Sequence, residues 1–173
     1  MRVLSSLLVT AGLLGFAGCG YHTLGASAHL PPQTRTLAVP VFATQTDTYH
    51  TEAVMTEAVI REFASRSGFR VLPDTTSDPD AVLHGTILQE SVVPLTYNTS
   101  TQQSSSYLIT VVASVTLTGR DGHVLYERKN YVFRQQYQTT TNLPVYFDES
   151  PAAIERLSRD FARALVADVL EGL

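Results

Sequence analysis

Cys19 is the only cysteine among the 173 residues of the chain, so one molecule cannot form an internal disulfide or a site that needs several thiolates. It follows an apolar run over residues 3–16 and two small residues, Ala17-Gly18, and Arg2 places a positive charge at the start. These are the three parts of a secretory signal. Because the apolar run is shorter than the roughly 20 residues that span a membrane, we predict a signal peptide over residues 1–18.

The four residues that end at Cys19, Phe-Ala-Gly-Cys, resemble a bacterial lipobox. The resemblance implies that the Cys19 thiol is alkylated with diacylglycerol, that the signal peptide is cut before it, and that the new amine is acylated. Each buried methylene of such an anchor contributes about 0.8 kcal/mol to membrane binding. Gly20 rather than aspartate follows the cysteine, which by resemblance to enterobacterial lipoproteins favours the outer membrane. We therefore expect a lipid-anchored chain on the periplasmic side, and acyl chains on Cys19 in place of any cofactor.

The other residues that could do chemistry form no recognisable catalytic or metal-binding motif. No two histidines stand four residues apart on a predicted helix, and no carboxylate completes a zinc pattern. The chain has no nucleophile elbow and no phosphate-binding glycine motif, and serines 104–106 lie in a predicted loop without a nearby base. We predict no metal site and no enzyme. The histidines are His22, His29, His50, His84 and His123.

The charge balance excludes a non-specific nucleic-acid binder, which needs a basic surface. Lysines and arginines number 12 against 16 acidic residues, giving a formal net charge of −4, and removal of Arg2 makes the mature chain more negative. The mature length suits one domain. We predict a lipidated N-terminus and tether over residues 19–33, with Pro31-Pro32 near its end, and a single domain over residues 34–173.

The first half of that domain reads as a strand, a helix and a short extended segment. Residues 36–42 predict a strand, in which Pro40 indicates an edge position or a bulge because proline cannot donate to a neighbouring strand. Residues 52–67 have the apolar spacing of a helix. Gly68 fits the left-handed position that often ends one. Residues 69–72 are short and extended.

The second half reads as three strands and a helix. The strands are predicted over residues 81–93, 107–118 and 123–136, with a hairpin turn at Asp121-Gly122 between the last two. The final helix begins with Ser150 as N-cap and Pro151 at its first position. Its buried stripe is predicted to contain Ile154, Leu157, Phe161, Leu165 and Val169.

This order, β-α-β-β-β-α, predicts an α+β fold. The first strand-helix-strand unit should be a crossover with parallel strands, and hairpins should connect the rest. The result is a mixed four-stranded sheet with two amphipathic helices packed on one face.

Two stretches of the chain carry no charge. Residues 91–119 contain no Asp, Glu, Lys, Arg or His, and residues 135–147 are also uncharged. One interpretation is a pair of loops and a buried strand. The other is that both stretches lie inside a partner, because neutral polar side chains can hydrogen-bond in an enclosed interface without burying an unpaired charge.

The order of several segments resembles the LptE family of LPS-assembly lipoproteins. They are Cys19-Gly20-Tyr21, residues 30–42 with their Leu-Pro and Thr-Leu-Ala-Val-Pro-Val-Phe segments, residues 80–85, residues 107–117 and the last helix. The resemblance implies a lipoprotein that plugs the outer-membrane barrel LptD, helps to assemble it and takes part in placing LPS in the outer leaflet. It also implies that the loop between the second and third strands contacts the barrel, and we expect these contacts from Tyr97, Asn98 and Tyr107.

An acidic protein needs a local basic cluster to bind the phosphates of LPS. Arg128, Lys129 and Arg134 form the densest such cluster outside the final helix. Strand alternation predicts Arg128 and Arg134 on one face and Lys129 on the other. The alternative is that these cations are solvated or paired with carboxylates across the sheet.

Two other classes of function compete with LPS transport. One is a lipoprotein that scaffolds a different envelope machine, such as a secretion channel, and the other is a lipid-anchored hydrolase. A convergent nucleophile and base would favour the hydrolase, whereas copurification with an LptD-type barrel would separate the first two.

Overall fold

The computed structural model describes residues 30–46, 50–96, 106–140, 147–148 and 150–171. Its long elements are the helices α2 (Thr51–Arg66) and α3 (Ser150–Glu171) and the strands β4 (Ala81–Pro94), β5 (Ser106–Gly119) and β6 (Val124–Thr140). Four short strands complete it: β1 (Thr36–Ala38), β2 (Ala43–Thr44), β3 (Arg70–Leu72) and β7 (Phe147–Asp148). Every helix and strand predicted from the sequence is present, with β6 running four residues further than expected.

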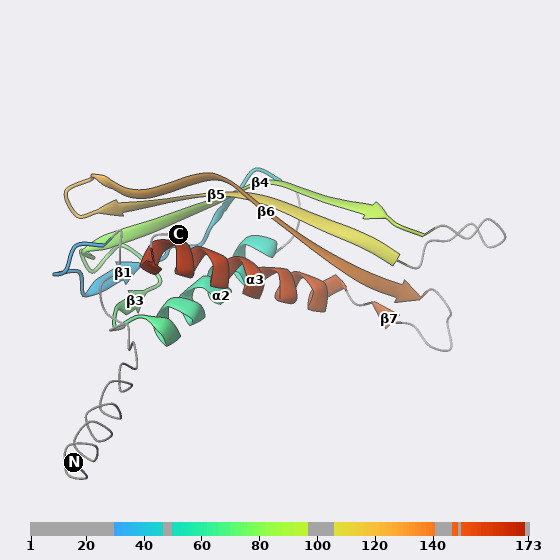
Figure 1. Ribbon diagram of the computed structural model, residues 1–173, viewed down its shortest axis with the longest axis horizontal. Helices are drawn as coiled ribbons and strands as arrows, with labels where there is room; N and C mark the ends of the chain where they lie inside the picture. Colours follow the sequence, from blue (N-terminus) through green and yellow to red (C-terminus); the bar gives the residue numbers. More distant parts are fainter. Residues whose placement is uncertain (1–29, 47–49, 97–105, 141–146, 149, 172–173) are drawn as a thin grey trace, which may run out of the picture.

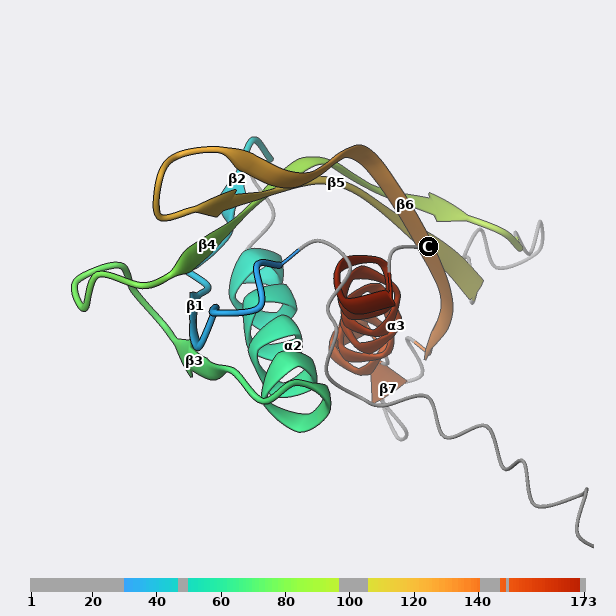
Figure 2. The same cartoon turned by 60° about the vertical axis from the view of Figure 1, so that its left-hand side comes forward.

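The sheet is mixed, and both helices lie against one of its faces. Its strand order is β3-β1-β4-β5-β6-β7, with β2 paired to β4, so it has seven strands rather than the predicted four. β1 runs parallel to β3 and β4, whereas β4, β5 and β6 form an antiparallel meander. The sheet arches over the two helices, which lie side by side (Figure 2). The predicted α+β class is therefore correct, and the extra strands are two- and three-residue segments.

The first predicted strand is interrupted, and it does not form an edge. β1 lies between β3 and β4, and the chain leaves it after Ala38 and returns as β2 beside β4. Pro40 lies in the interruption, where its missing N–H costs no ladder hydrogen bond. The ring of Phe42 then packs so closely over Gly85 that a methyl group at Gly85 would lie 2.5 Å from it.

Helix α2 ends without the left-handed glycine that the sequence predicts. Ser67 is its C-cap in an extended conformation, and both the main-chain N–H and the hydroxyl of Ser67 donate to the carbonyl of Phe63, at 2.9 and 2.6 Å. The φ angle of Gly68 is not positive. Among the described glycines only Gly122 has a positive φ, at 80°. Gly122 forms the predicted hairpin turn between β5 and β6.

The core fills the space between the helices and the sheet. Phe161 of α3 lies at its centre and makes edge-on contacts with three rings, those of Phe42, Tyr131 and Phe133, at centroid distances of 6.1, 5.5 and 5.6 Å. The two helices run in the same direction, with Arg66 at the end of α2 paired to Glu171 at the end of α3 (Figure 1). The far ends of β4 and β5 extend past the helices, and residues 30–33, the described part of the tether, lie at the opposite end of the sheet (Figure 1).

Candidate interaction surface

A bulge in β6 decides which way its basic side chains point. Tyr131 lies opposite Ala113 of β5, but Arg128 lies opposite Val115, so three steps along β6 match two along β5. Ala113 and Val115 are both buried against the helices. The extra residue in β6 therefore turns Arg128 toward the helices as well as Tyr131.

Arg128 is held on the helix side by a carboxylate from α3. Its Nη1 atom lies 2.5 Å from Oδ2 of Asp168, whose side chain is only 13% exposed. The same oxygen accepts hydrogen bonds from the hydroxyls of Tyr131 and Tyr126, at 2.6 and 3.2 Å. The guanidinium carbon of Arg128 also lies 4.3 Å from the centre of the Tyr131 ring. This network ties the start of β6 to the last turns of α3.

The two tyrosines of this network stay protonated over the ordinary pH range. Burial raises the pKa of Tyr131 far above its usual value, and its hydrogen bond to Asp168 raises the pKa further. Burial likewise raises the pKa of Tyr126. Both hydroxyls are therefore available as donors to the Asp168 carboxylate, which accepts from two neutral groups and one cation at the same oxygen.

Arg134 lies on the opposite face of the sheet from Arg128. It pairs with Thr110, whose neighbours Ile109 and Val111 point into the core, so Thr110 and Arg134 face away from the helices. The prediction that Arg128 and Arg134 share a face is wrong. Simple alternation assumes an unbroken strand, and the bulge between the two arginines inverts it.

Lys129 lies on the outer face together with Arg134, whereas strand alternation predicted it on the face opposite both arginines. Its ammonium lies 3.6 Å from Glu127, and Glu127 pairs with Thr116, which faces away from the helices. The lysine side chain is 79% exposed. Within the described ranges, no carboxylate lies within ion-pair distance of Arg134, so Arg134 is the outer-face cation whose charge is least compensated.

The outward row of β5 is neutral. The outward residues of β5 are threonines, a serine and two apolar residues, and nearby Val132 is 39% exposed. Where β4 extends past the helices, Val92, Val93 and Leu95 are each nearly half exposed. The outward row of β5 consists of Leu108, Thr110, Val112, Ser114, Thr116 and Thr118.

One predicted barrel-contact residue lies within the described part of the chain. The ring of Tyr107 stacks on that of Tyr137 with centroids 5.4 Å apart, at the far end of the sheet. Tyr97 and Asn98, like Cys19, fall outside the described residues. The structure places Tyr107 opposite Pro94 of β4, next to the exposed Val93, and all three expected barrel contacts stay predictions.

At the tether end, Asp80 joins three segments. Its carboxylate accepts from the main-chain N–H groups of Arg35 and Thr36 and from the Thr36 hydroxyl, each at 2.9 Å. It also pairs with Arg120 of the β5–β6 hairpin at 3.2 Å. The main-chain hydrogen bond from Arg35, with those from Thr36, lowers the pKa of Asp80 to about 2.

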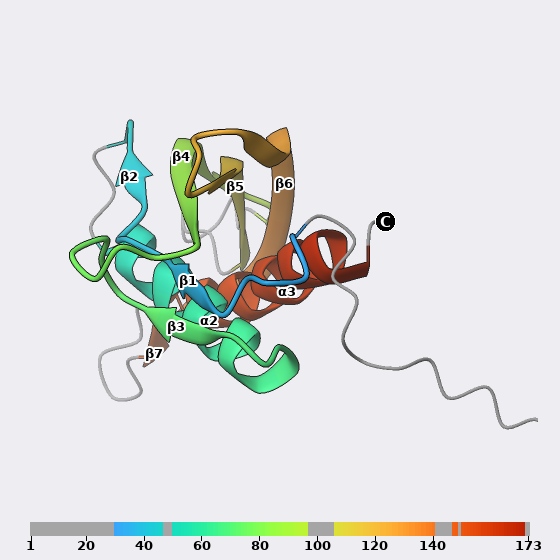
Figure 3. The same cartoon turned by 90° about the vertical axis from the view of Figure 1, so that its left-hand side faces the viewer.

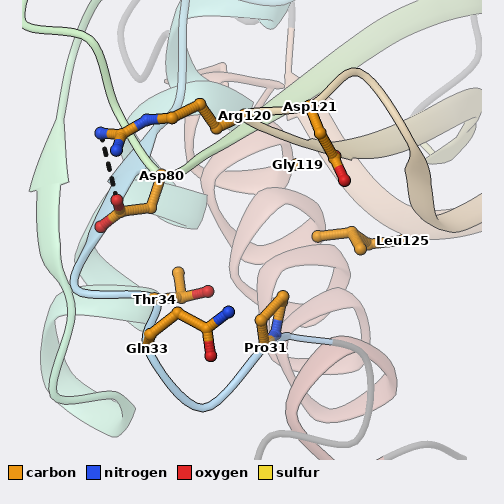
Figure 4. Close-up of a pocket in the computed structure, with 8 residues that line it drawn as sticks. All are labelled: Pro31, Gln33, Thr34, Asp80, Gly119, Arg120, Asp121 and Leu125. Carbon is orange, nitrogen blue, oxygen red and sulfur yellow. Dashed lines mark ion pairs between the residues drawn. The ribbon is translucent and has the colours of Figure 1, made fainter.

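Asp80 and Arg120 line a pocket of about 370 Å³ between the hairpin and the start of the domain (Figure 4). Their side chains point toward each other there, while Gln33, Thr34 and Leu125 line the other walls. Both charged groups already have partners, because Arg120 also pairs with Asp78. The pocket thus offers no free charge from this pair to a ligand.

Sequence reasoning missed Asp168 and Asp80 as organising residues. Asp168 stands three residues after Leu165 of the predicted stripe and beside Val169, and an acid inside an apolar stripe is the signal that could have marked it. Asp80 lies in a segment that resembles the LptE family, but only the fold brings it to Arg35 and Thr36.

Nothing in the described part of the chain indicates a metal centre or a spanning helix. No group of three or more histidine, cysteine, aspartate or glutamate side chains there could hold a metal ion. None of the described helices is long and apolar enough to cross a membrane.

Comparison with known proteins identifies a family. The model of the family LptE, described as lipopolysaccharide-assembly, matches residues 34–169. No curated protein matches the chain.

Several solved structures share the fold at low sequence identity. A lipoprotein B from Nitrosomonas europaea has a TM-score of 0.54 and 9% identity, covering 82% of this chain and 84% of its own. A putative lipoprotein from Caulobacter crescentus has a TM-score of 0.51 and 11% identity, covering 77% and 88%. A Xanthomonas campestris protein has a TM-score of 0.50 and 15% identity, covering 81% and 88%.

Proposed function

The chain belongs to the LptE lipopolysaccharide-assembly family, and on that premise we propose that it is a non-catalytic outer-membrane lipoprotein that plugs an LptD-type barrel. In this role it helps to assemble the barrel and takes part in transporting LPS to the outer leaflet. The family match over residues 34–169 is the observation that carries the proposal, because it spans nearly all of the described domain. The acyl chains on Cys19 hold the protein at the periplasmic side of the outer membrane.

The neutral outward row of β5 and the far end of the sheet support an enclosed position. The outward row of β5 offers hydroxyls and small apolar groups, and Val92 and Val93 expose apolar surface beyond the helices. Threonine and serine can exchange hydrogen bonds with a wet barrel wall without leaving a charge buried and unpaired. Tyr107 belongs to this same end of the domain. In the proposed complex Tyr97, Asn98 and Tyr107 contact the barrel lumen.

The cations that meet LPS phosphates are Arg134 and Lys129, with Arg128 in a supporting position. Arg134 is exposed on the outer face and has no carboxylate partner among the described residues. Lys129 lies on the same side but is opposed by Glu127. Arg128 is engaged by Asp168, so it orders β6 rather than reaching a ligand.

Site-specific cross-linking in the envelope tests the proposal. A photo-crosslinker at Tyr97, Asn98 or Tyr107 should capture the barrel, and the lipoprotein should copurify with it in detergent. A crosslinker at Arg61, on the exposed side of α2, is the matched control and should give at most a weak product. If none of the three positions captures a barrel, while the protein copurifies with a secretion channel, the scaffold function replaces the proposed one.

A further inference from the structure

The pocket at the tether end of the domain has no part in the proposed function. Two distant parts of the chain line it, one within residues 31–34 and the other within residues 119–125 of the β5–β6 hairpin, together with Asp80 (Figure 4). Both parts face the viewer in Figure 3, which looks onto this end of the molecule. The volume of the pocket, about 370 Å³, falls within the range of sites that bind small ligands.

Asp121 gives the pocket a negative charge that is not compensated. Its Oδ1 atom accepts the main-chain N–H of His123 at 3.1 Å. In the part of the chain that the structure describes, no cationic side chain lies within ion-pair distance of the Asp121 carboxylate, because Arg120 is engaged by Asp78 and Asp80. Three of these four charged side chains are acids, so the excess charge favours a cationic ligand.

Thr34 supplies a buried polar atom without a partner. The residue is 8% exposed, and its main-chain N–H donates to the carbonyl of Pro31 at 2.9 Å. Its hydroxyl makes no hydrogen bond with any described residue, and Figure 4 shows it pointing into the pocket. A buried hydroxyl without a partner lowers stability unless a ligand or water completes it. Gln33 also lines the pocket and offers an amide oxygen as a further acceptor.

The remaining walls of the pocket are apolar. Leu125 lines one side and Pro31 another (Figure 4). Gly119 lies between the acid of the hairpin and this leucine, because a methyl group at Gly119 would lie 2.9 Å from Oδ1 of Asp121 and 3.5 Å from a methyl carbon of Leu125. A carboxylate and an apolar wall are therefore close together, as the charged end and the alkyl stem of an amphipathic side chain require.

We propose that this pocket binds the side-chain ammonium of a lysine from another polypeptide. An ammonium has three donors and no acceptor, and the pocket offers it the second carboxylate oxygen of Asp121, the hydroxyl of Thr34 and the amide oxygen of Gln33. The methylenes of the lysine lie along Leu125 and Pro31. The inference goes beyond the proposed function and does not depend on the barrel or on LPS.

The chain's own lysine and membrane lipids are poorer occupants. Lys129 is the only lysine of the chain, and its ammonium lies 3.6 Å from Glu127 on β6, so a second copy would have to break that pair to fill the pocket. The ammonium of a phosphatidylethanolamine headgroup is joined to a phosphate, which the acidic residues around the pocket would repel. A lysine on an otherwise neutral segment of another polypeptide avoids both costs.

Peptide titrations of the full lipidated chain in phosphocholine micelles test the pocket. The probes are three capped tripeptides with glycine at both ends and lysine, acetyl-lysine or arginine at the centre. The lysine peptide should shift the methyl NMR signals of Thr34 and Leu125. It should bind about tenfold more tightly than the acetyl-lysine peptide, which has lost the positive charge, and more tightly than the arginine peptide.

Substitutions assign the binding to the named groups. Asp121→Asn should weaken binding of the lysine peptide about three- to tenfold. Asparagine keeps an oxygen for the N–H of His123 and suits the turn with Gly122, so the hairpin stays folded. Thr34→Val, which removes the hydroxyl at nearly constant volume, should weaken binding about threefold. Asp160→Asn, an exposed change on α3, is the matched control and should leave the affinity unchanged.

Four results would each overturn the proposal. They are equal binding of the lysine and acetyl-lysine peptides, tighter binding of the arginine peptide, an unchanged affinity in both pocket variants, and shifts of the Thr34 and Leu125 signals when phosphatidylethanolamine is added to the micelles. The last result would assign the pocket to a lipid headgroup instead.

Discussion

Arg128 and Asp168 are 40 residues apart in the chain, and their guanidinium and carboxylate groups lie 2.5 Å apart between β6 and α3. The contact exists because a bulge in β6 turns Arg128 inward at the level where Asp168 faces the sheet. Arg134, six residues further along, faces the opposite way. One inserted residue therefore divides a basic cluster into a cation that holds the fold together and a cation that is exposed to a ligand.

The Asp168 network should contribute measurably to stability. Asp168→Ala leaves Arg128 and two tyrosine hydroxyls without their shared acceptor, so we expect the free energy of unfolding to fall by about 2–3 kcal/mol. Chemical denaturation with a fluorescence readout measures the change. Asp160→Ala, an exposed acid on the same helix, is the matched control and should change stability by less than about 0.5 kcal/mol. Equal effects of the two substitutions would mean that the network adds nothing to the free energy of unfolding.

The division of the basic cluster predicts different effects of two substitutions on LPS binding. Arg134→Glu should weaken binding about three- to tenfold at low salt, because an exposed contact worth up to about 1 kcal/mol becomes a repulsion. The difference should shrink as salt screens the phosphates. Arg128→Gln should instead lower stability and leave LPS affinity nearly unchanged in protein that stays folded. A larger loss of affinity in the Arg128 variant would contradict the assignment.

Position 85 should not tolerate even the small side chain of alanine without a loss of stability. A methyl group there would lie 2.5 Å from ring carbons of Phe42, which is itself packed against Phe161, so Gly85→Ala should cost about 1–3 kcal/mol of stability. Thermal or chemical unfolding measures this cost. Gly68→Ala is the control, since an added methyl at Gly68 meets no atom within 4 Å and its φ is not positive. If both variants are as stable as the wild type, Phe42 does not require glycine at position 85.

Asp80 should make stability depend on pH in the acid range. Its pKa is about 2 in the folded chain, below the ordinary 3.8, so folding favours the charged form. Its stabilising contribution is therefore complete above pH 3.8 and is lost as the pH falls toward 2. The stability gap between wild type and Asp80→Asn should narrow over that interval, whereas Asp160→Asn should show no such gap. A gap that is constant from pH 6 to pH 2 would be inconsistent with the lowered pKa.

Cys19 should carry the lipid anchor. Cys19→Ala should abolish fatty-acid labelling and release the protein from membranes, because the chain has no other thiol that diacylglycerol could alkylate. Membrane fractionation and intact-mass measurement follow the change, with Ser6→Ala inside the signal segment as the control that should keep the anchor. A mature wild-type protein whose mass contains no acyl chains would refute the assignment.

Local patterns in the sequence were sufficient for the element order and the fold class. The apolar spacing of α3, with Leu157, Phe161 and Leu165 on one stripe, and the alternation of β5 each follow from a repeat that one face of a core imposes. The turn at Gly122 follows from its freedom to adopt a positive φ. The family resemblance, which rests on the order of segments, agrees with the family match over residues 34–169.

The tertiary structure alone decided how the candidate surface is divided. The bulge between Tyr131 and Arg128 reflects how two strands fit together, so no periodicity within β6 could reveal it, and it separates Arg128 from Arg134. Asp168 acquires its role only because α3 packs under that bulge. Local sequence sets the period of each element, whereas register, and with it the face that each charge occupies, depends on contacts between residues far apart in the chain.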